Sequence, residues 1–174
     1  VTLELGGKSA DIILEDGDVA TKMAFLGFMC MHAGQGCAML TRTLIHQSRY
    51  DEAVELAVEA QGLLGADIQM VLDVCATLPA TPEILRVAVD RTAQWAARAR
   101  RHHQRLEQRP EGQALFGIVQ GGTDPALRAE SAERTVALEF DGYGIGGLSV
   151  GEPRPAMLEA LAATVPHLPV DRPR

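Results

Sequence analysis

Three short predicted strands of this sequence are followed by residues that could bind a flat, polar ligand. In chain order these are 68–72 with Asp73, 114–119 with Gln120, and 141–145 with Gly147 and Leu148. A carboxylate accepts hydrogen bonds and a carboxamide both donates and accepts them. Glycine lets a ring lie against the backbone, so Gly147 could offer its N–H, and Leu148 its carbonyl, to a heterocycle.

Each of these ends also has a plainer interpretation. Double glycines, as at 121–122 and 146–147, are common in tight turns. A carboxylate such as Asp73 at the end of a strand often only caps the next loop. The presence of three such ends in one chain favours a binding site over three separate turns.

Parallel strands would bring these ends together. Residues 114–119 have the pattern of a short buried strand, and Asp124 and Pro125 have the types expected at a helix N-cap and first helical position. A second strand is predicted at 141–145. This order favours neighbouring parallel strands joined by a right-handed crossover, whose carboxyl ends share one edge of the sheet.

Periodicity and helix-breaking residues predict the remaining elements. They are strands at 1–5 and 9–14, a helix from 16–18 to Phe28, helices at 49–61, 82–107 and 153–164, and an extended tail from 165. The apolar residues predicted to pack from the long helix are Ile84, Leu85, Ala88, Trp95, Ala96 and Ala99. Its basic end could contact RNA phosphates. A solvated terminus that complements the helix dipole is the favoured interpretation, because no aromatic residues are interleaved for stacking on bases.

Cys37 is a second candidate for chemistry. It lies in the glycine-containing loop 33–37 after a predicted helix, where backbone N–H groups would lower the pKa of a thiol. The alternative is a small buried hydrophobic residue, and this is the interpretation favoured for Cys30 on the helix. His32 could serve Cys37 as a base, but a histidine near a helix end is more often a cap or exposed.

Composition sets broad limits on the function. The chain has 174 residues, 47% of them hydrophobic, and a net charge of −7, so a nucleic-acid partner is not indicated by total charge. Its three cysteines form no CxxC pair, which fits a reducing compartment and predicts neither disulfides nor a metal site. No signal-peptide or membrane-spanning pattern occurs, so we expect a cytoplasmic protein. The chain begins within a predicted strand, as a piece of a larger protein would.

Residues 61–174 resemble bacterial tRNA-guanine transglycosylase, the enzyme that exchanges an anticodon guanine for a queuosine precursor. The matching segments are 64–68, 73–75, 116–122 and 141–152, and together they are far more specific than a lone glycine motif. The resemblance implies a (β/α)8 (TIM) barrel, of which residues 67–164 would supply three strand–helix units. It also implies tRNA and a guanine-like base as partners.

The same resemblance assigns roles to individual residues. It implies that Asp73 reads the amidine edge of guanine, while Gln120 and the Gly147 N–H meet its carbonyl oxygen. It further implies that the Leu148 carbonyl meets the aminomethyl group of the precursor. In the same pattern Cys75 lines the pocket and Glu152 supports the Gly147–Leu148 loop. The covalent aspartate nucleophile and the zinc site of the intact family would lie beyond Arg174, so exchange by this chain alone is not expected.

Residues 1–60 resemble a different family, the NAD(P)-dependent aldehyde dehydrogenases. The resemblance rests on 3–9, 34–37 and 41–42. It implies that Cys37 is the nucleophile that forms a thiohemiacetal and that Glu4 is the general base for deacylation. The nucleotide-binding domain of that family would flank this stretch, so no NAD(P) is expected on this chain.

Three hypotheses therefore follow. The chain is a transglycosylase fragment with pocket residues but no nucleophile, an aldehyde dehydrogenase fragment without its cofactor domain, or a non-enzymatic fusion of the two. The predicted fold class is α/β, a partial (β/α)8 barrel preceded by a dehydrogenase-like α/β fragment, with the junction inside the helix near 50–65. Incomplete layers of this kind have unpaired strand edges, so self-association is expected.

Overall fold

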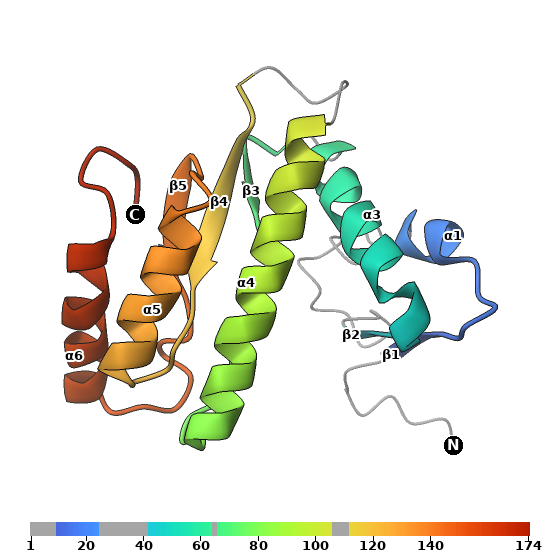
Figure 1. The fold of residues 1–174 in the computed structure, drawn as a ribbon. Coiled ribbons are helices and arrows are strands. Elements are labelled where there is room, and N and C mark those ends of the chain that lie inside the picture. Colours follow the sequence, from blue (N-terminus) through green and yellow to red (C-terminus); the bar gives the residue numbers. More distant parts are fainter. Residues whose placement is uncertain (1–9, 25–41, 64–65, 106–111) are drawn as a thin grey trace, which may run out of the picture. The chain divides into compact units, whose positions relative to one another are not determined.

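The structure is a computed structural model, and it describes residues 10–24, 42–63, 66–105 and 112–174. Contacts within the chain divide it into two compact units, 1–64 and 65–174, and each is described by itself (Figure 1). The described helices include none long and apolar enough to cross a membrane.

The first unit contains two strands that pair in parallel. In chain order its elements are β1 (Ala10–Ile13), α1 (Val19–Ala24), β2 (Arg42–Ile45), the 3-10 helix η2 (Gln47–Arg49) and α3 (Tyr50–Leu63). The buried residues Ile13, Val19, Ala53, Val54 and Ala57 form its apolar interior. β1 and α3 confirm the strand and the helix predicted at 9–14 and 49–61.

The second unit is a run of strand–helix pairs. Its elements are β3 (Ile68–Met70), α4 (Pro82–Arg105), β4 (Ala114–Val119), α5 (Pro125–Val136), β5 (Gly142–Ile145), α6 (Arg154–Thr164) and the 3-10 helix η3 (Val165–His167). The strands are parallel in the order β3–β4–β5, with Met70 opposite Phe116 and Phe116 opposite Gly142. This arrangement confirms the predicted parallel strands and is consistent with a segment of a (β/α)8 barrel.

The helices of this unit form one layer beside the sheet. Figure 1 shows α4, α5 and α6 side by side in front of the strands, and α4 and α5 both pack against β4. Leu115 and Val119 of β4 are buried together with Leu127 and Ala132 of α5, because alternate residues of the strand face the helices. This layer fixes the positions at which the strands end.

Two details of the second unit differ from the sequence predictions. Ile84 was expected to pack but is 53% exposed, because the buried stripe of α4 runs through Leu85 and Val89 instead. The tail after α6 begins with η3 rather than extended chain, and it returns to the sheet, where the Tyr143 N–H donates to the carbonyl of Pro173. The C-terminal residues therefore cover part of the outer edge of β5.

Candidate functional site

The side chain of Gln120 contacts the side chain of Asp73 at the carboxyl ends of β4 and β3. The Gln120 amide nitrogen donates to a carboxylate oxygen of Asp73 over 2.5 Å. Gln120 is only 1% exposed, and its backbone N–H donates to the hydroxyl of Ser131 on α5. The backbone of Gln120 is therefore fixed to α5, while its side chain is fixed to the loop after β3.

Asp73 lies in a loop that a hydrogen bond to α4 holds in place. The N–H of Val74 donates to the hydroxyl of Thr92, a residue of α4 that is fully buried. Asp73 itself is partly exposed, and Cys75, two residues further on, is exposed as a free thiol. The loop thus turns one carboxylate toward Gln120 and leaves a thiol at the surface nearby.

The glycine pair after β5 lies directly against the Gln120 side chain. Gly147 has a φ of +68°, a conformation that suits glycine, and a Cβ placed on it would overlap the amide oxygen of Gln120. A Cβ on Gly146 would lie 2.8 Å from the amide nitrogen. Asp73, Gln120 and Gly147 therefore come together, as expected if the three strand ends share one edge of the sheet.

Glu152 organises the turn that follows Leu148. Its carboxylate accepts hydrogen bonds from the backbone N–H groups of Ser149 and Val150, the latter over 2.9 Å. These hydrogen bonds lower the pKa of the Glu152 carboxyl, and the positive charge of Arg128 lowers it further. Glu152 therefore stays ionised and keeps the turn closed, with Leu148 half-buried beside it.

Sequence analysis missed Arg128, the largest fully buried side chain near these loops. Its guanidinium donates to the carbonyls of Gly122 and Gly146, each over 2.7 Å, and to that of Gly147 over 3.2 Å. The available signal was its spacing: with Leu127, Ser131 and Ala132 it occupies the buried stripe of α5, where a charged residue is uncommon.

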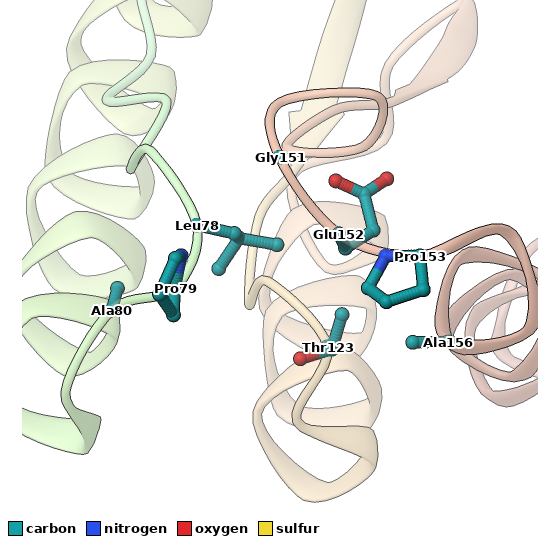
Figure 2. A pocket seen from close by; sticks show the side chains of 8 residues that line it. All are labelled: Leu78, Pro79, Ala80, Thr123, Gly151, Glu152, Pro153 and Ala156. Carbon is teal, nitrogen blue, oxygen red and sulfur yellow. The ribbon is translucent and has the colours of Figure 1, made fainter.

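A cavity of about 310 Å³ lies next to the turn that Glu152 closes. Figure 2 shows Leu78 and Pro79 on one side of it, Pro153 on the other and Thr123 between them. The Glu152 carboxylate points toward the loop of Gly151, which agrees with its backbone hydrogen bonds. Neither Asp73 nor Gln120 lines this cavity, so it is separate from the cluster at the strand ends.

The candidate residues of the first unit lie outside the described part of the chain. These are Glu4, Cys30, His32 and Cys37. Within the described residues, no group of three or more His, Cys, Asp or Glu side chains could hold a metal ion. The transglycosylase resemblance places the zinc site of the intact family beyond Arg174, so these residues are not expected to form it.

Comparison with known proteins identifies the family to which the chain belongs. The family model described as queuine tRNA-ribosyltransferase matches residues 16–174, and the chain belongs to this family. It is 47% identical to the queuine tRNA-ribosyltransferase of Natranaerobius thermophilus over 133 residues, which is 76% of this chain and 35% of that protein. It is 50% identical to that of Symbiobacterium thermophilum over 76% of the chain and 32% of the relative. The chain thus spans about a third of the length of these curated relatives.

These matches change the interpretation of the N-terminal residues. The family model includes residues 16–60, and a match of 133 residues is longer than the stretch 61–174. The comparisons therefore give no support to an aldehyde dehydrogenase part in this chain. The division of the structure after residue 64 lies near the junction predicted from sequence, whereas the family match crosses it.

Proposed function

We propose that this chain supplies the base-recognition part of a tRNA-guanine transglycosylase, which exchanges guanine in tRNA for a queuosine precursor. The observation that carries the proposal is the 2.5 Å hydrogen bond from Gln120 to Asp73 beside Gly147. Such a cluster offers a carboxylate, a carboxamide and backbone groups within one small space. The proposal is supported by the relatives, which are named queuine tRNA-ribosyltransferases.

The hydrogen-bonding groups of the cluster complement the edges of guanine. The carboxyl oxygens of Asp73 accept from the two N–H groups of the amidine edge. Gln120 has two amide hydrogens, so it can donate one to Asp73 and the other to the carbonyl oxygen of the base. The N–H of Gly147 meets the same oxygen, and the Leu148 carbonyl accepts from an aminomethyl substituent of the precursor. Cys75 borders the base at the surface.

Preorganisation gives this arrangement its selectivity. A base extruded from tRNA loses its stacking and pairing, and a slot whose groups are already in place recovers part of that cost. Thr92 and Ser131 hold the backbone at Val74 and Gln120 before any ligand arrives. Because tRNA is the proposed substrate, the site of action is the cytoplasm.

The test of this function is a binding measurement on the chain. We expect calorimetry to detect guanine binding, with adenine binding at least tenfold more weakly. Asp73→Asn should weaken guanine binding by about tenfold or more, because a charged acceptor is lost and an amide N–H₂ faces the N–H groups of the base. Gln120→Ala should weaken it by a similar factor.

Asp124→Asn is the matched control for this experiment. Asp124 caps α5 through the N–H of Leu127, and asparagine caps helices about as well as aspartate. Its guanine affinity should therefore equal that of the unmodified chain. Equal affinity for guanine and adenine, or an undiminished affinity in Asp73→Asn, would contradict the proposed function.

Self-association is a further expected property of the chain. Within the described part, β3 has a neighbour on one side only, and its residues Ile68 and Met70 are 50% and 39% exposed. An exposed strand edge with apolar side chains pairs readily with other chains. Light scattering should report a mass above that of the monomer. This mass should decrease in the double variant Ile68→Lys/Met70→Lys. Ile84→Lys, at an equally exposed position on α4, should leave the mass unchanged, and a monomeric starting chain would refute the expectation.

A further inference from the structure

Arg128 connects two of the loops that form the candidate site. Its Nε donates to the carbonyl of Gly122 in the loop after β4, while Nη1 and Nη2 donate to the carbonyls of Gly146 and Gly147 after β5. A weaker contact of 3.4 Å joins Nη1 to the carbonyl of Val119. One planar guanidinium thus holds both strand ends at fixed positions relative to each other.

The burial of this charge is costly, and no ion pair within the described residues offsets the cost. Taking a cation out of water costs several kcal/mol even after relaxation, whereas an apolar side chain of similar volume would pack at no such cost. Burial accordingly lowers the pKa of Arg128 to about 10, although the charge of Glu152 acts in the opposite direction. Arg128 is still charged at neutral pH, and all of its hydrogen-bond acceptors are backbone carbonyls.

The geometry of the peptide bond shows how the hydrogen bonds of Arg128 orient the N–H of Gly147. In a trans peptide the carbonyl of one residue and the N–H of the next point in opposite directions. The carbonyl of Gly146 points at the guanidinium, so the N–H of Gly147 must point away from it. The carbonyl of Gly147 also accepts a hydrogen bond from Arg128, which fixes the plane of the peptide bond between Gly147 and Leu148.

We propose that Arg128 is a positioning residue for base recognition, which orients the Gly147 N–H toward the carbonyl oxygen of a bound guanine-like base. This inference rests on the proposed function, because it assigns a purpose to the Gly147 N–H in that site. Arg128 does not touch the base. It acts through two peptide planes, and lysine cannot reproduce this because a single ammonium does not span three carbonyls in a planar fork.

A comparison of two ligands separates this role from a general structural one. The bases are guanine and 2-aminopurine, which keeps the amino group of guanine but lacks the carbonyl oxygen and the N1 hydrogen. The missing N1 hydrogen weakens its binding to Asp73 equally in every variant, so each variant is compared with the unmodified chain for the same base. Titration of 2-aminopurine fluorescence gives one dissociation constant, and competition by guanine gives the other. In Arg128→Met we expect guanine binding to weaken about tenfold, the value of one hydrogen bond, and 2-aminopurine binding to change less than twofold.

The remaining variants complete the ligand test. Arg128→Lys should give an intermediate guanine affinity. Arg134→Met removes an arginine of the same helix whose ion-pair partners among the described residues are Asp90 and Glu130 at the surface, so it should change neither affinity. An equal loss for both bases in Arg128→Met, or no loss for either, would overturn the proposal and leave Arg128 with a structural role alone.

A measurement without ligand keeps the inference separate from the proposed function. The N–H of Gly146 donates to the carbonyl of Val119 over 2.9 Å, so its hydrogen exchange reports opening of the loop after β5. In Arg128→Lys and Arg128→Met we expect this amide to exchange about tenfold faster, while the Leu127 amide at the start of α5 keeps its rate. An unmodified chain that binds neither base would refute the proposed function. Unchanged exchange at Gly146, or equal acceleration at Leu127, would refute the role of Arg128.

Discussion

Incorporation of labelled guanine into tRNA by this chain alone should remain near background. Cleavage of the glycosidic bond builds positive charge on the ribose, which a carboxylate nucleophile opposite the departing base can capture. Asp73 is badly placed for that task, because its carboxylate is bound to Gln120 and in the proposed site it faces the edge of the base. Loss of a covalent nucleophile typically reduces a rate by on the order of 10⁴ or more.

The other carboxylates near the strand ends are also engaged. Asp124 accepts from the N–H of Leu127, and Glu152 accepts from two backbone N–H groups of its own turn. Asp141 accepts from the N–H of Leu115, the second residue of β4, and therefore lies at the opposite end of the sheet. Among the described residues, then, no carboxylate near the strand ends is placed to attack the ribose.

The measurement is transfer of radiolabelled guanine into a tRNA with a GUN anticodon. Asp73→Asn is the control, and it should give the same background signal as the unmodified chain. Robust incorporation that disappears in Asp73→Asn would show that a nucleophile is present within these residues.

Gly151→Ala should be among the most destabilising single substitutions in the second unit. Gly151 has a φ of +129°, which residues with a side chain rarely adopt, and a Cβ there would overlap the carbonyl oxygen of Leu78. The segment cannot easily move aside, because the N–H of Leu78 donates to the carbonyl of Val150. Backbone strain and overpacking each cost about 1–3 kcal/mol, so we expect a loss of about 3 kcal/mol or more.

Gly112→Ala provides the comparison for this substitution. Gly112 also has a positive φ, +81°, but a Cβ placed on it would meet no atom within 4 Å. Only strain remains, at about 1 kcal/mol. Urea unfolding followed by circular dichroism should therefore show a much larger decrease in midpoint for Gly151→Ala. Equal midpoints for the two variants would contradict the predicted clash.

The N-terminal part shows the limit of short motifs. Residues 3–9 and 34–37 suggested an aldehyde dehydrogenase with Glu4 and Cys37 as catalytic residues, yet the family match from residue 16 gives that interpretation no support. A few glycines and a cysteine recur in many loops, so a short motif without its surrounding domain discriminates weakly. The motifs at 116–122 and 141–152 are longer and agree with the family found by comparison.

The sequence by itself determined the parallel strand order and the edge at which Asp73, Gln120 and Gly147 lie. Strands are recognisable from their apolar runs, and a parallel arrangement brings the carboxyl ends together whatever the details of packing. Only the tertiary structure decided how these residues are held. Arg128, Thr92 and Ser131 belong to helices, and the partners Gly146, Val74 and Gln120 lie in the loops after three different strands. A buried polar side chain must find its hydrogen-bond partners in three dimensions, and helical spacing shows only that it is buried.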